Sequence, residues 1–345
     1  MKNISELRQD LVTGAWVVVA TGRAKRPHQF VRKKKEIVPS RNGCPFEALM
    51  KNALLVIDRK GEEYRLTKKD LPHLKKNWFL QVVPNKYPAF GKGVCQVERK
   101  IGPHHWMDGV GSHEVIITRD HTGPIALMSQ RETENVVKSY RDRYIALKDE
   151  DCVEYISIFH NHGKEVGASI FHPHSQLIAT PVIPPDIERS LKGSADYAHR
   201  HKNACVHCVM LDFERKDGRR IVYENEEFLV ICPFVSRIAF EIRIFPKKHS
   251  PRFEISHDDD LPHIADALRT ALGKLHRALG NPPHNFFIHT APTAHSKEFD
   301  HYHWHLEILP KTAVWAGFEI STGIDISTIA PEKAAGFLRK TRVSQ

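Results

Sequence analysis

The residues of this chain best suited to phosphate chemistry lie in a short run near its middle. Residues 171–176 read FHPHSQ, and the apolar residues 177–179 follow. This pattern predicts a β-strand over 172–179, in which residues two apart share one face. His172, His174 and Gln176 would then project in one row. Two imidazoles and an amide offer a metal ligand, a nucleophile and a hydrogen-bond donor for a phosphate oxygen.

Small and amide residues just upstream favour the same chemistry. Asn161, Gly163 and Ser169 precede the run. Such residues let a phosphate approach the backbone and supply donors to its oxygens. If His172 faces a metal, His174 is the free imidazole, which can attack phosphorus and form a covalent phosphoramidate. The sequence therefore predicts a phosphate-handling active site.

Cysteine and histidine spacing in the second half predicts a zinc site. Cys205 and Cys208 have the two-residue spacing of a metal chelate, and histidine is abundant, at 23 of 345 residues. With His249 and His303 they would form a Cys2His2 shell in which the protein fills every position, so the site would be structural. Another histidine of the 301–305 segment can replace His303, and two incidental thiols without a metal are the alternative.

The first half carries a similar but mixed set of possible ligands. Cys44 and Glu47 are followed by His121 and His172, in the same order as the set of the second half. Zinc accepts carboxylate oxygen as well as thiolate and imidazole, so these four side chains can form a shell. Because the mixed set is less thiophilic, another divalent metal, or none, is the alternative.

Composition bounds the class of protein. The chain has 41% hydrophobic and 27% charged residues, which is ordinary for a folded globular protein. No apolar run reaches the roughly 18 residues that a membrane helix needs, and the start lacks the apolar core of a signal peptide. We therefore expect a cytoplasmic protein without a membrane partner. Six cysteines are too few to indicate a disulfide framework.

The net charge of +10 favours an anionic ligand, either nucleic acid or a phosphorylated small molecule. Two basic clusters, residues 23–26 and 32–35, lie near the N-terminus. A zinc-stabilised nucleotide- or RNA-binding module would interleave aromatic residues with such clusters, and only Trp16 and Phe30 lie nearby. Nucleic acid is therefore not the expected partner.

The order of predicted elements repeats in the two halves. Strands are predicted over 15–20, 78–83, 114–118, 155–159 and 172–179, with a helix opened by a capping box at Ser129 and Glu132. In the second half they are predicted over 220–223, 228–231, 240–245, 285–289 and 303–309, with a helix after Asp258. The possible metal ligands also recur in order. An internal duplication is predicted, each half an α+β unit in which an antiparallel sheet carries a helix.

The boundary between the two units is predicted between residues 189 and 190. Residues 1–189 would carry the active-site motif, and residues 190–345 the structural metal site. Residues 190–202 are polar and contain glycine and serine, so they are the predicted connector.

Several blocks in order along the chain resemble the galactose-1-phosphate uridylyltransferase family, a branch of the histidine-triad superfamily. The resemblance extends from about residue 7 to about residue 339 and rests on residues 8–17, 23–27, 83–88, 159–163, 167–169, 172–176, 304–307, 317–319 and 331–332. Gln176 matches the transferases, whereas the hydrolase branch has histidine there. The resemblance implies a fold of two tandem histidine-triad-like repeats.

The resemblance also implies ping-pong transfer of a nucleotidyl group. His174, aided by Gln176, would attack the α-phosphorus of a nucleotide sugar and release a hexose 1-phosphate, and a second sugar phosphate would take the nucleotidyl group. The implied substrate-binding residues are Asn161, Gly163 and Ser169 at the phosphate, Asn85 at the nucleoside, Glu319 at the sugar, and Arg23 and Arg26 from the neighbouring subunit of a homodimer.

The chain departs from the best-known members in ways that leave the substrate open. Glu47 stands where that family has a zinc cysteine, while Ser175 and the Cys205/Cys208 pair resemble plant-type and archaeal members. Some plant-type relatives are ADP-glucose phosphorylases with phosphate as acceptor. The expected activity is thus UDP-glucose:hexose-1-phosphate uridylyltransfer, with an ADP-glucose phosphorylase or a dinucleotide hydrolase as the alternatives.

Overall fold

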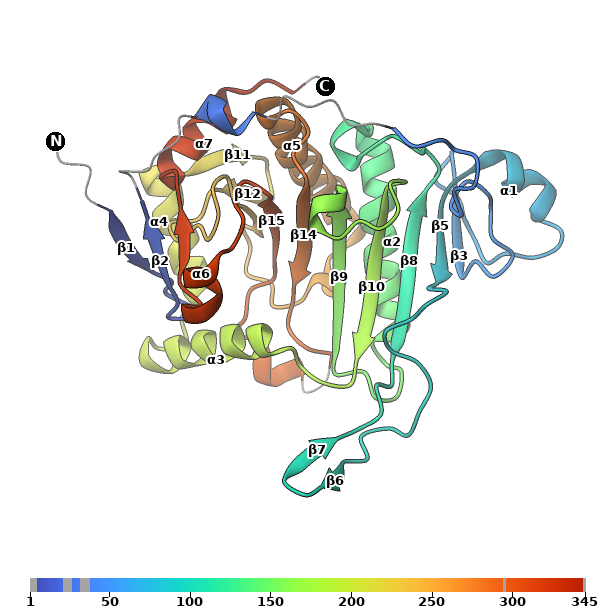
Figure 1. Ribbon diagram of the computed structural model, residues 1–345, viewed down its shortest axis with the longest axis horizontal. Coiled ribbons are helices and arrows are strands. Elements are labelled where there is room, and N and C mark those ends of the chain that lie inside the picture. Colours follow the sequence, from blue (N-terminus) through green and yellow to red (C-terminus); the bar gives the residue numbers. More distant parts are fainter. Residues whose placement is uncertain (1–4, 21–26, 32–37, 294–295, 344–345) are drawn as a thin grey trace.

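The computed structural model describes residues 5–20, 27–31, 38–293 and 296–343 (Figure 1). Both basic clusters, residues 23–26 with Arg23 and Arg26 and residues 32–35, lie outside these ranges. Among the described helices, none is both long and apolar enough to cross a membrane.

The first half follows the predicted order of strands and one long helix. Its elements are β1 (Glu6–Gln9), β2 (Trp16–Val19), β3 (Leu55–Asp58), β4 (Glu63–Tyr64), α1 (Leu71–Asn77), β5 (Trp78–Pro84), β6 (Arg99–Ile101), β7 (His104–Trp106), β8 (Ser112–Thr118), α2 (Gln130–Leu147), β9 (Tyr155–His162) and β10 (His174–Thr180). Helix α2 begins at the predicted capping box, where the Ser129 side chain accepts from the Glu132 amide.

The second half repeats the order. Its elements are α3 (Pro185–Arg200), α4 (Val206–Asp217), β11 (Ile221–Glu224), β12 (Phe228–Ile231), β13 (Ile242–Pro246), α5 (Leu261–Leu279), β14 (His284–His289), β15 (His305–Pro310), α6 (Gly317–Thr322), β16 (Asp325–Ser327) and α7 (Pro331–Lys340). Helix α5 ends at Gly280, which adopts a left-handed conformation that suits glycine.

Both halves contribute to one antiparallel sheet of 11 strands, in the order β4-β3-β5-β8-β10-β9-β14-β15-β13-β12-β11. The halves meet where β9 pairs with β14, with Asn161 opposite Asn285. Outward from this seam, the first half runs β9-β10-β8-β5-β3 and the second β14-β15-β13-β12-β11. The two orders match strand for strand, as an internal duplication requires, and the α+β class is as predicted.

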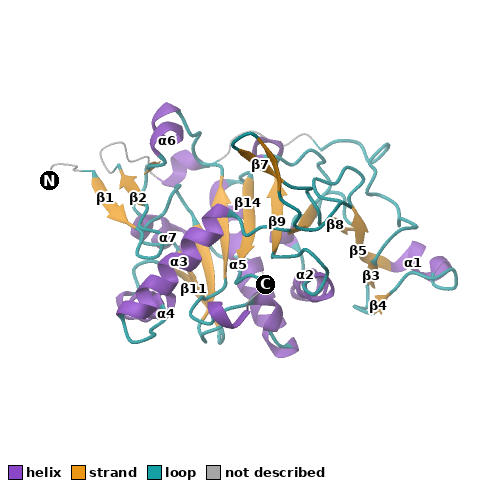
Figure 2. Cartoon of the chain, turned by 90° about the horizontal axis from the view of Figure 1, so that it is seen from below, coloured by secondary structure: helices purple, strands orange, loops and turns teal. Residues whose placement is uncertain are grey.

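Helices α2 and α5 pack against each other on one face of the sheet (Figure 1 and Figure 2). Each follows the matching strand, β8 or β13, and presents buried apolar residues such as Tyr144 and Leu268. These residues join one core cluster that spans both halves. Because burial of apolar surface is the main favourable contribution to folding, the halves stabilise each other.

The N-terminal strands lie with the second half. β1 pairs with β2, and β2 pairs in parallel with β16 near the C-terminus. Residues 190–200, expected in a polar connector, belong instead to helix α3. This helix approaches the N-terminal turn so closely that a Cβ on Gly193 would meet the Val12 carbonyl oxygen at 1.7 Å. The predicted boundary at 189/190 thus falls within α3.

One disulfide was not predicted. Cys95, before the β6–β7 hairpin that projects from the body of the molecule (Figure 1), is bonded to Cys152, after α2. Their Cα atoms are 5.6 Å apart. The cysteines are 57 residues apart in sequence, and only the fold brings them together. The four other cysteines are free.

Candidate active site and metal centres

His174 is the first residue of strand β10, and its ring is fixed by the backbone. Its Nδ1 lies 2.9 Å from the carbonyl oxygen of His172, so Nδ1 donates and Nε2 keeps its lone pair. No described residue forms a hydrogen bond with that Nε2. His172 itself precedes the strand, so the prediction that it shares a strand face with His174 was wrong. His172 contacts His174 through its backbone carbonyl, and not as a neighbour on the same strand face.

Burial keeps the His174 imidazole neutral. The side chain is 7% exposed, and desolvation lowers its pKa, although its bond to the His172 carbonyl acts in the opposite direction. The edge of Phe46 packs against the ring at 5.1 Å between centroids. A neutral imidazole with a free lone pair is the form that can attack an electrophile.

The Ser175 side chain connects β10 to helix α2 and strand β9 through hydrogen bonds. Its hydroxyl lies 2.5 Å from the Tyr140 hydroxyl on α2 and 2.9 Å from Nδ1 of His160 on β9. All three side chains are buried. A satisfied buried network of this kind restrains β10 relative to α2, and so restrains the histidine one residue earlier.

Gln176 lies on β10 beside the loop that carries Asn85. Its Oε1 is 2.8 Å from Nε2 of His113 on β8, and Asn85 Nδ2 is 3.0 Å from the same nitrogen. His113 Nδ1 accepts from the backbone amide of Ala89 at 3.2 Å. The predicted residues Asn85 and Gln176 are therefore brought together, around a histidine that the sequence analysis did not single out.

Asn161 lies on β9, two strands from β8, and also has a partner that was not predicted. Its Oδ1 accepts from Nδ2 of Asn285 on β14 at 2.7 Å. Gly163 follows with φ at +97°, and a Cβ there would meet Pro283 at 2.8 Å, so only glycine fits. Ser169 is exposed, in the loop before His174. The seam between the halves therefore forms part of the predicted phosphate site.

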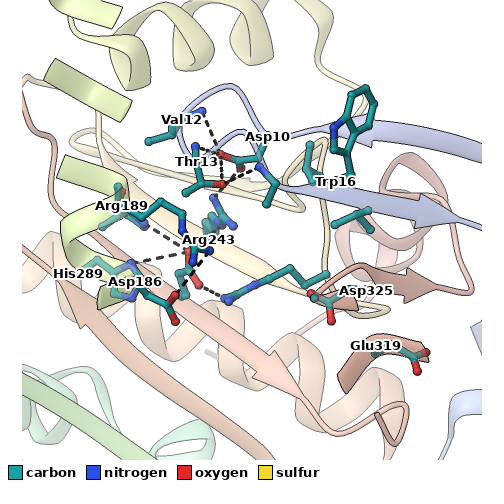
Figure 3. A pocket seen from close by; sticks show the side chains of 18 of the residues that line it. Asp10, Val12, Thr13, Trp16, Asp186, Arg189, Arg243, His289, Glu319 and Asp325 are labelled. Atoms are coloured by element: carbon teal, nitrogen blue, oxygen red, sulfur yellow. Dashed lines mark hydrogen bonds and ion pairs between the residues drawn. The ribbon is translucent and has the colours of Figure 1, made fainter. Parts of the chain in front are cut away.

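Within one chain, Glu319 does not lie beside His174, Gln176 or Asn161. It lies in α6, on the wall of a cavity of about 350 Å³ that is also lined by Trp16, His305 and Glu307 (Figure 3). His305 and Glu307 occupy on β15 the positions that His174 and Gln176 occupy on β10. Glu319 is therefore next to the second repeat's counterpart of the site.

The four predicted ligands of the first half converge. Glu47 Oε1 lies 2.5 Å from Nδ1 of His121 and 3.3 Å from Nδ1 of His172, and Cys44 Sγ is 3.6 Å from the latter. The Nε2 atoms of both histidines face backbone carbonyls, at 3.2 Å from Pro39 and 2.6 Å from Thr118. Both Nδ1 lone pairs are thereby directed at one point, as metal binding requires.

The second predicted set converges in the same way. Cys208 Sγ lies 3.6 Å from Nδ1 of His249 and 3.5 Å from Nδ1 of His303, with Cys205 in the same group. Nε2 of His249 is 2.8 Å from the Asp300 carbonyl, and Nε2 of His303 is 2.9 Å from that of Pro246. The choice of His303 within the 301–305 segment agrees with this geometry.

In the second set, a hydrogen bond between the two thiols lowers the pKa of Cys205 and raises that of Cys208. The pair thus shares one proton, which a bound metal would displace. In the first set, Glu47 Oε1 and His121 Nδ1 are buried and without a hydrogen-bond donor between them. Both sets therefore fit a metal by donor type and by orientation.

A third group of possible ligands is His289, His305 and Glu307 in the second repeat. Glu307 contacts Arg237 and lies 3.1 Å from Arg243. Although burial opposes ionisation, the two guanidinium groups lower the pKa of Glu307 well below its usual range. With two cations on its carboxylate, this counterpart of Gln176 forms an ion-pair network and has no donor to offer an oxyanion.

Comparison with known proteins identifies the family. A family model described as galactose-1-phosphate uridyl transferase, N-terminal domain, matches residues 1–184, and a domain of unknown function, DUF4921, matches residues 97–341. The ADP-glucose phosphorylase of Arabidopsis thaliana is 31% identical over 98% of this chain and 93% of its own length. The galactose-1-phosphate uridylyltransferase of Thermotoga maritima is also 31% identical, over 98% and 99%.

Solved structures agree. The crystal structure of an ADP-glucose phosphorylase from Arabidopsis thaliana with bound ADP-glucose has a TM-score of 0.79 and 28% identity, and covers 99% of this chain and 100% of that one. A galactose-1-phosphate uridylyltransferase-like protein from the same plant has a TM-score of 0.76. The chain therefore belongs to the galactose-1-phosphate uridylyltransferase family and is a nucleotidyltransferase.

Proposed function

We propose that this enzyme moves a nucleoside monophosphate from a nucleotide sugar to a hexose 1-phosphate through a covalent intermediate on His174. The observation that carries the proposal is the buried, neutral imidazole of His174, whose Nδ1 is engaged and whose Nε2 is free. Such a ring is a competent nucleophile toward phosphorus, and no charged side chain needs to be deprotonated first.

The chemistry divides into two displacements. His174 Nε2 attacks the α-phosphorus, the bond between that phosphorus and the bridging oxygen breaks, and the hexose 1-phosphate leaves with the bond's electron pair. A phosphate oxygen of the acceptor then attacks the same phosphorus, and the N–P bond breaks to restore His174. Amide N–H groups of Gln176 and Asn161 would stabilise the charge that develops on the non-bridging oxygens.

The remaining predicted residues take supporting roles in this proposal. Asn85 would contact the nucleoside, Gly163 and Ser169 would line the phosphate, and Glu319 would bind the sugar. Because Glu319 lies at the second repeat's cavity, it would reach the sugar from a second subunit. Arg23 and Arg26, outside the described residues, are proposed to act from that subunit too.

A homodimer has support on the surface around α6. Four apolar side chains there are substantially exposed: Val314 at 77%, Trp315 at 52%, Phe318 at 47% and Ile320 at 76%. Exposed apolar residues gathered in one short segment are typical of an interaction surface. We infer that this segment packs against a second copy of the chain and places Glu319 beside its active site.

Zinc is the proposed metal for both sets. Cys205, Cys208, His249 and His303 would hold it in a closed structural shell, and Cys44, Glu47, His121 and His172 would hold a second ion. A bound ion would supply rigidity at the start of β10, because His172 is both a proposed ligand and the residue whose carbonyl orients His174.

The second candidate activity is an ADP-glucose phosphorylase, with adenine as base and phosphate as acceptor. The observation that favours it is the 31% identity and matching fold of the Arabidopsis thaliana protein with that name. The first half-reaction releases a hexose 1-phosphate in both cases, and only the nucleobase and the acceptor differ.

The two activities are separated by a panel of donors and acceptors. The enzyme is given UDP-glucose or ADP-glucose together with galactose 1-phosphate, phosphate or water, and the products are separated by chromatography. UDP-galactose from the first pair supports the uridylyltransferase, and ADP from ADP-glucose and phosphate supports the phosphorylase. Hydrolysis with water at the rate of either acceptor would contradict both.

A further inference from the structure

The side-chain amides of Asn161 and Gln176 in the candidate phosphate site are each hydrogen-bonded to a neighbouring side chain. We propose that Asn285 and His113 are positioning residues that fix the side chains of Asn161 and Gln176 so that both present N–H groups to the transferred phosphate. The proposal rests on the proposed function, since it assigns these residues to the same reaction. The orientation of each side-chain amide can be traced from a backbone group that can only accept, or only donate, a hydrogen bond.

The first restraint begins at the carbonyl of Val166, which can only accept. Asn285 Nδ2 lies 3.0 Å from that oxygen, so this end of the Asn285 amide is the NH2 group. The same NH2 lies 2.7 Å from Asn161, so the Asn161 atom facing it is the oxygen. Asn161 Nδ2 is therefore turned toward the loop at Gly167, 3.7 Å from where a Cβ would stand.

The second restraint begins at the backbone amide of Ala89, which can only donate. It donates to His113 Nδ1 at 3.2 Å, so in the neutral ring the proton is on Nε2. That proton is given to Gln176 Oε1 at 2.8 Å, which leaves the Gln176 NH2 group free to donate. Asn85 Nδ2 is also near Nε2, but as a donor it cannot accept that proton.

Orientation matters because an amide has opposite ends. With N–H toward the phosphate, each amide stabilises the developing negative charge, whereas a reversed amide would present an oxygen to it and repel it. A hydrogen bond on the oxygen holds the favourable orientation before substrate arrives. Asn285 belongs to the second repeat and stands opposite Asn161 in the β9–β14 pairing. The second repeat would thus act directly on the reaction in the first.

Asn285→Asp tests the first restraint with almost no change in shape. A carboxylate cannot donate to the Val166 carbonyl or to Asn161 Oδ1, so the Asn161 amide is expected to turn its NH2 toward position 285. Removal of one oxyanion donor costs about 10²–10³ in rate, and a reversed one should cost at least about tenfold. We expect the rate of nucleotidyl-enzyme formation at saturating nucleotide sugar to fall by that factor, with a smaller change in the half-saturating concentration.

Asn225→Asp is the matched control. Asn225 Nδ2 also donates to a backbone carbonyl, that of His263, and to a second side chain, Asp266, both at 2.9 Å. It lies in the turn between β11 and β12, away from the seam. This variant bears the cost of the same chemical change and is expected to form the nucleotidyl-enzyme at the wild-type rate.

His113 is tested by a rescue pair. His113→Leu removes both the acceptor and the donor, and the rate at saturation should fall about tenfold or more. His113→Gln restores an N–H near the position of Nε2, and its rate should lie clearly closer to wild type than that of His113→Leu. A residue that merely filled space would give the opposite ranking, because leucine is the better apolar filler.

The outcomes separate this inference from the proposed function. If the wild-type enzyme forms no nucleotidyl adduct, the proposed function fails. If it does, and Asn285→Asp and His113→Leu form the adduct at the wild-type rate, the positioning roles are overturned. Adduct amplitude and thermal melting are measured for every variant, so that rates refer to folded enzyme, and a slowed Asn225→Asp would also contradict the assignment.

Discussion

At the scale of single residues, the proposed reaction depends on the neutral ring of His174 and on the orientation of the side-chain amides of Asn161 and Gln176. His174 and Gln176 were predicted from spacing alone, because a histidine and an amide two residues apart on a strand share a face. We expect Gln176→Ala to lower the rate of nucleotidyl-enzyme formation by about 10²–10³, since it removes one donor to the charged oxygens. Rapid-quench kinetics at saturating donor would measure it. A loss confined to the half-saturating concentration would instead mean simple binding.

A second residue-scale prediction concerns acid stability. Burial lowers the pKa of His284 to about 3, with the nearby charges of His162 and His276 acting in the same direction. An unfolded histidine has a pKa near 6.5, so between these values the unfolded chain binds a proton that the folded chain excludes, and stability falls as pH falls. At pH 5 this residue alone should cost about 2 kcal/mol relative to pH 7.

His284→Phe keeps an aromatic ring and removes the titration. The loss of unfolding free energy between pH 7 and pH 5, measured by urea denaturation, should be smaller in the variant by about 2 kcal/mol. The exposed His104, replaced in the same way, is the control and should leave that loss unchanged. An equal loss in wild type and His284→Phe would contradict the prediction.

The residues that the sequence analysis missed have a physical explanation. Asn285 and His113 act through pairs of strands that are far apart in sequence, and only the register of β14 against β9 and the loop at Ala89 makes them neighbours. An asparagine or histidine on a strand carries no local pattern that marks such a role. The Cys95–Cys152 disulfide was missed for the same reason.

At the scale of elements, periodicity and capping predicted helices α2 and α5 and every strand of the large sheet except β3 and β4. The short strands β1, β6, β7 and β16 were also missed. The predicted starts of β10 and β15 were two residues too early. His172 and His303 continue the alternating sequence pattern of each strand, but they precede the strands and belong to the two groups of possible metal ligands. Helix α3 was missed since its polar composition resembles a connector, although Pro185 stands at a first helical position, where proline favours a helix.

An element-scale prediction concerns Cys205, Cys208, His249 and His303. A metal bound by these four side chains would join the start of α4 to the segments that carry the two histidines. Metal analysis should find zinc in the purified protein, and a strong chelator should lower the melting temperature by several degrees. Cys205→Ser should melt lower and respond less to the chelator. A wild-type melting temperature that stays unchanged after removal of the metal would contradict a structural role.

At the scale of the whole molecule, the duplication was predictable because the order of elements and ligands recurs, while the single sheet that joins the halves was not. Local patterns do not reveal that β9 and β14 pair. Nor do they reveal that Glu319 lies beside the second repeat's cavity. In the proposed homodimer, α6 of one subunit would place its Glu319 beside the active site of the other subunit, and this would explain why Glu319 lies away from His174 in its own chain.

Ile320→Asp tests the dimer. The side chain is 76% exposed, so the substitution should leave the fold intact and, by placing a charge in an apolar contact, convert the dimer to monomer and reduce activity together. Ile145→Asp on α2, another exposed isoleucine, is the matched control and should change neither. Sedimentation over a range of concentrations would measure assembly, and a fully active monomer would contradict the shared site.

The central claim, that His174 carries the nucleotidyl group, is tested most directly by the mass of the intact protein after incubation with nucleotide sugar alone. We predict an adduct of one nucleoside monophosphate, mapped to His174, that disappears when the acceptor is added and is absent from His174→Asn. Wild-type protein without an adduct, or an equal adduct on His174→Asn, would contradict it.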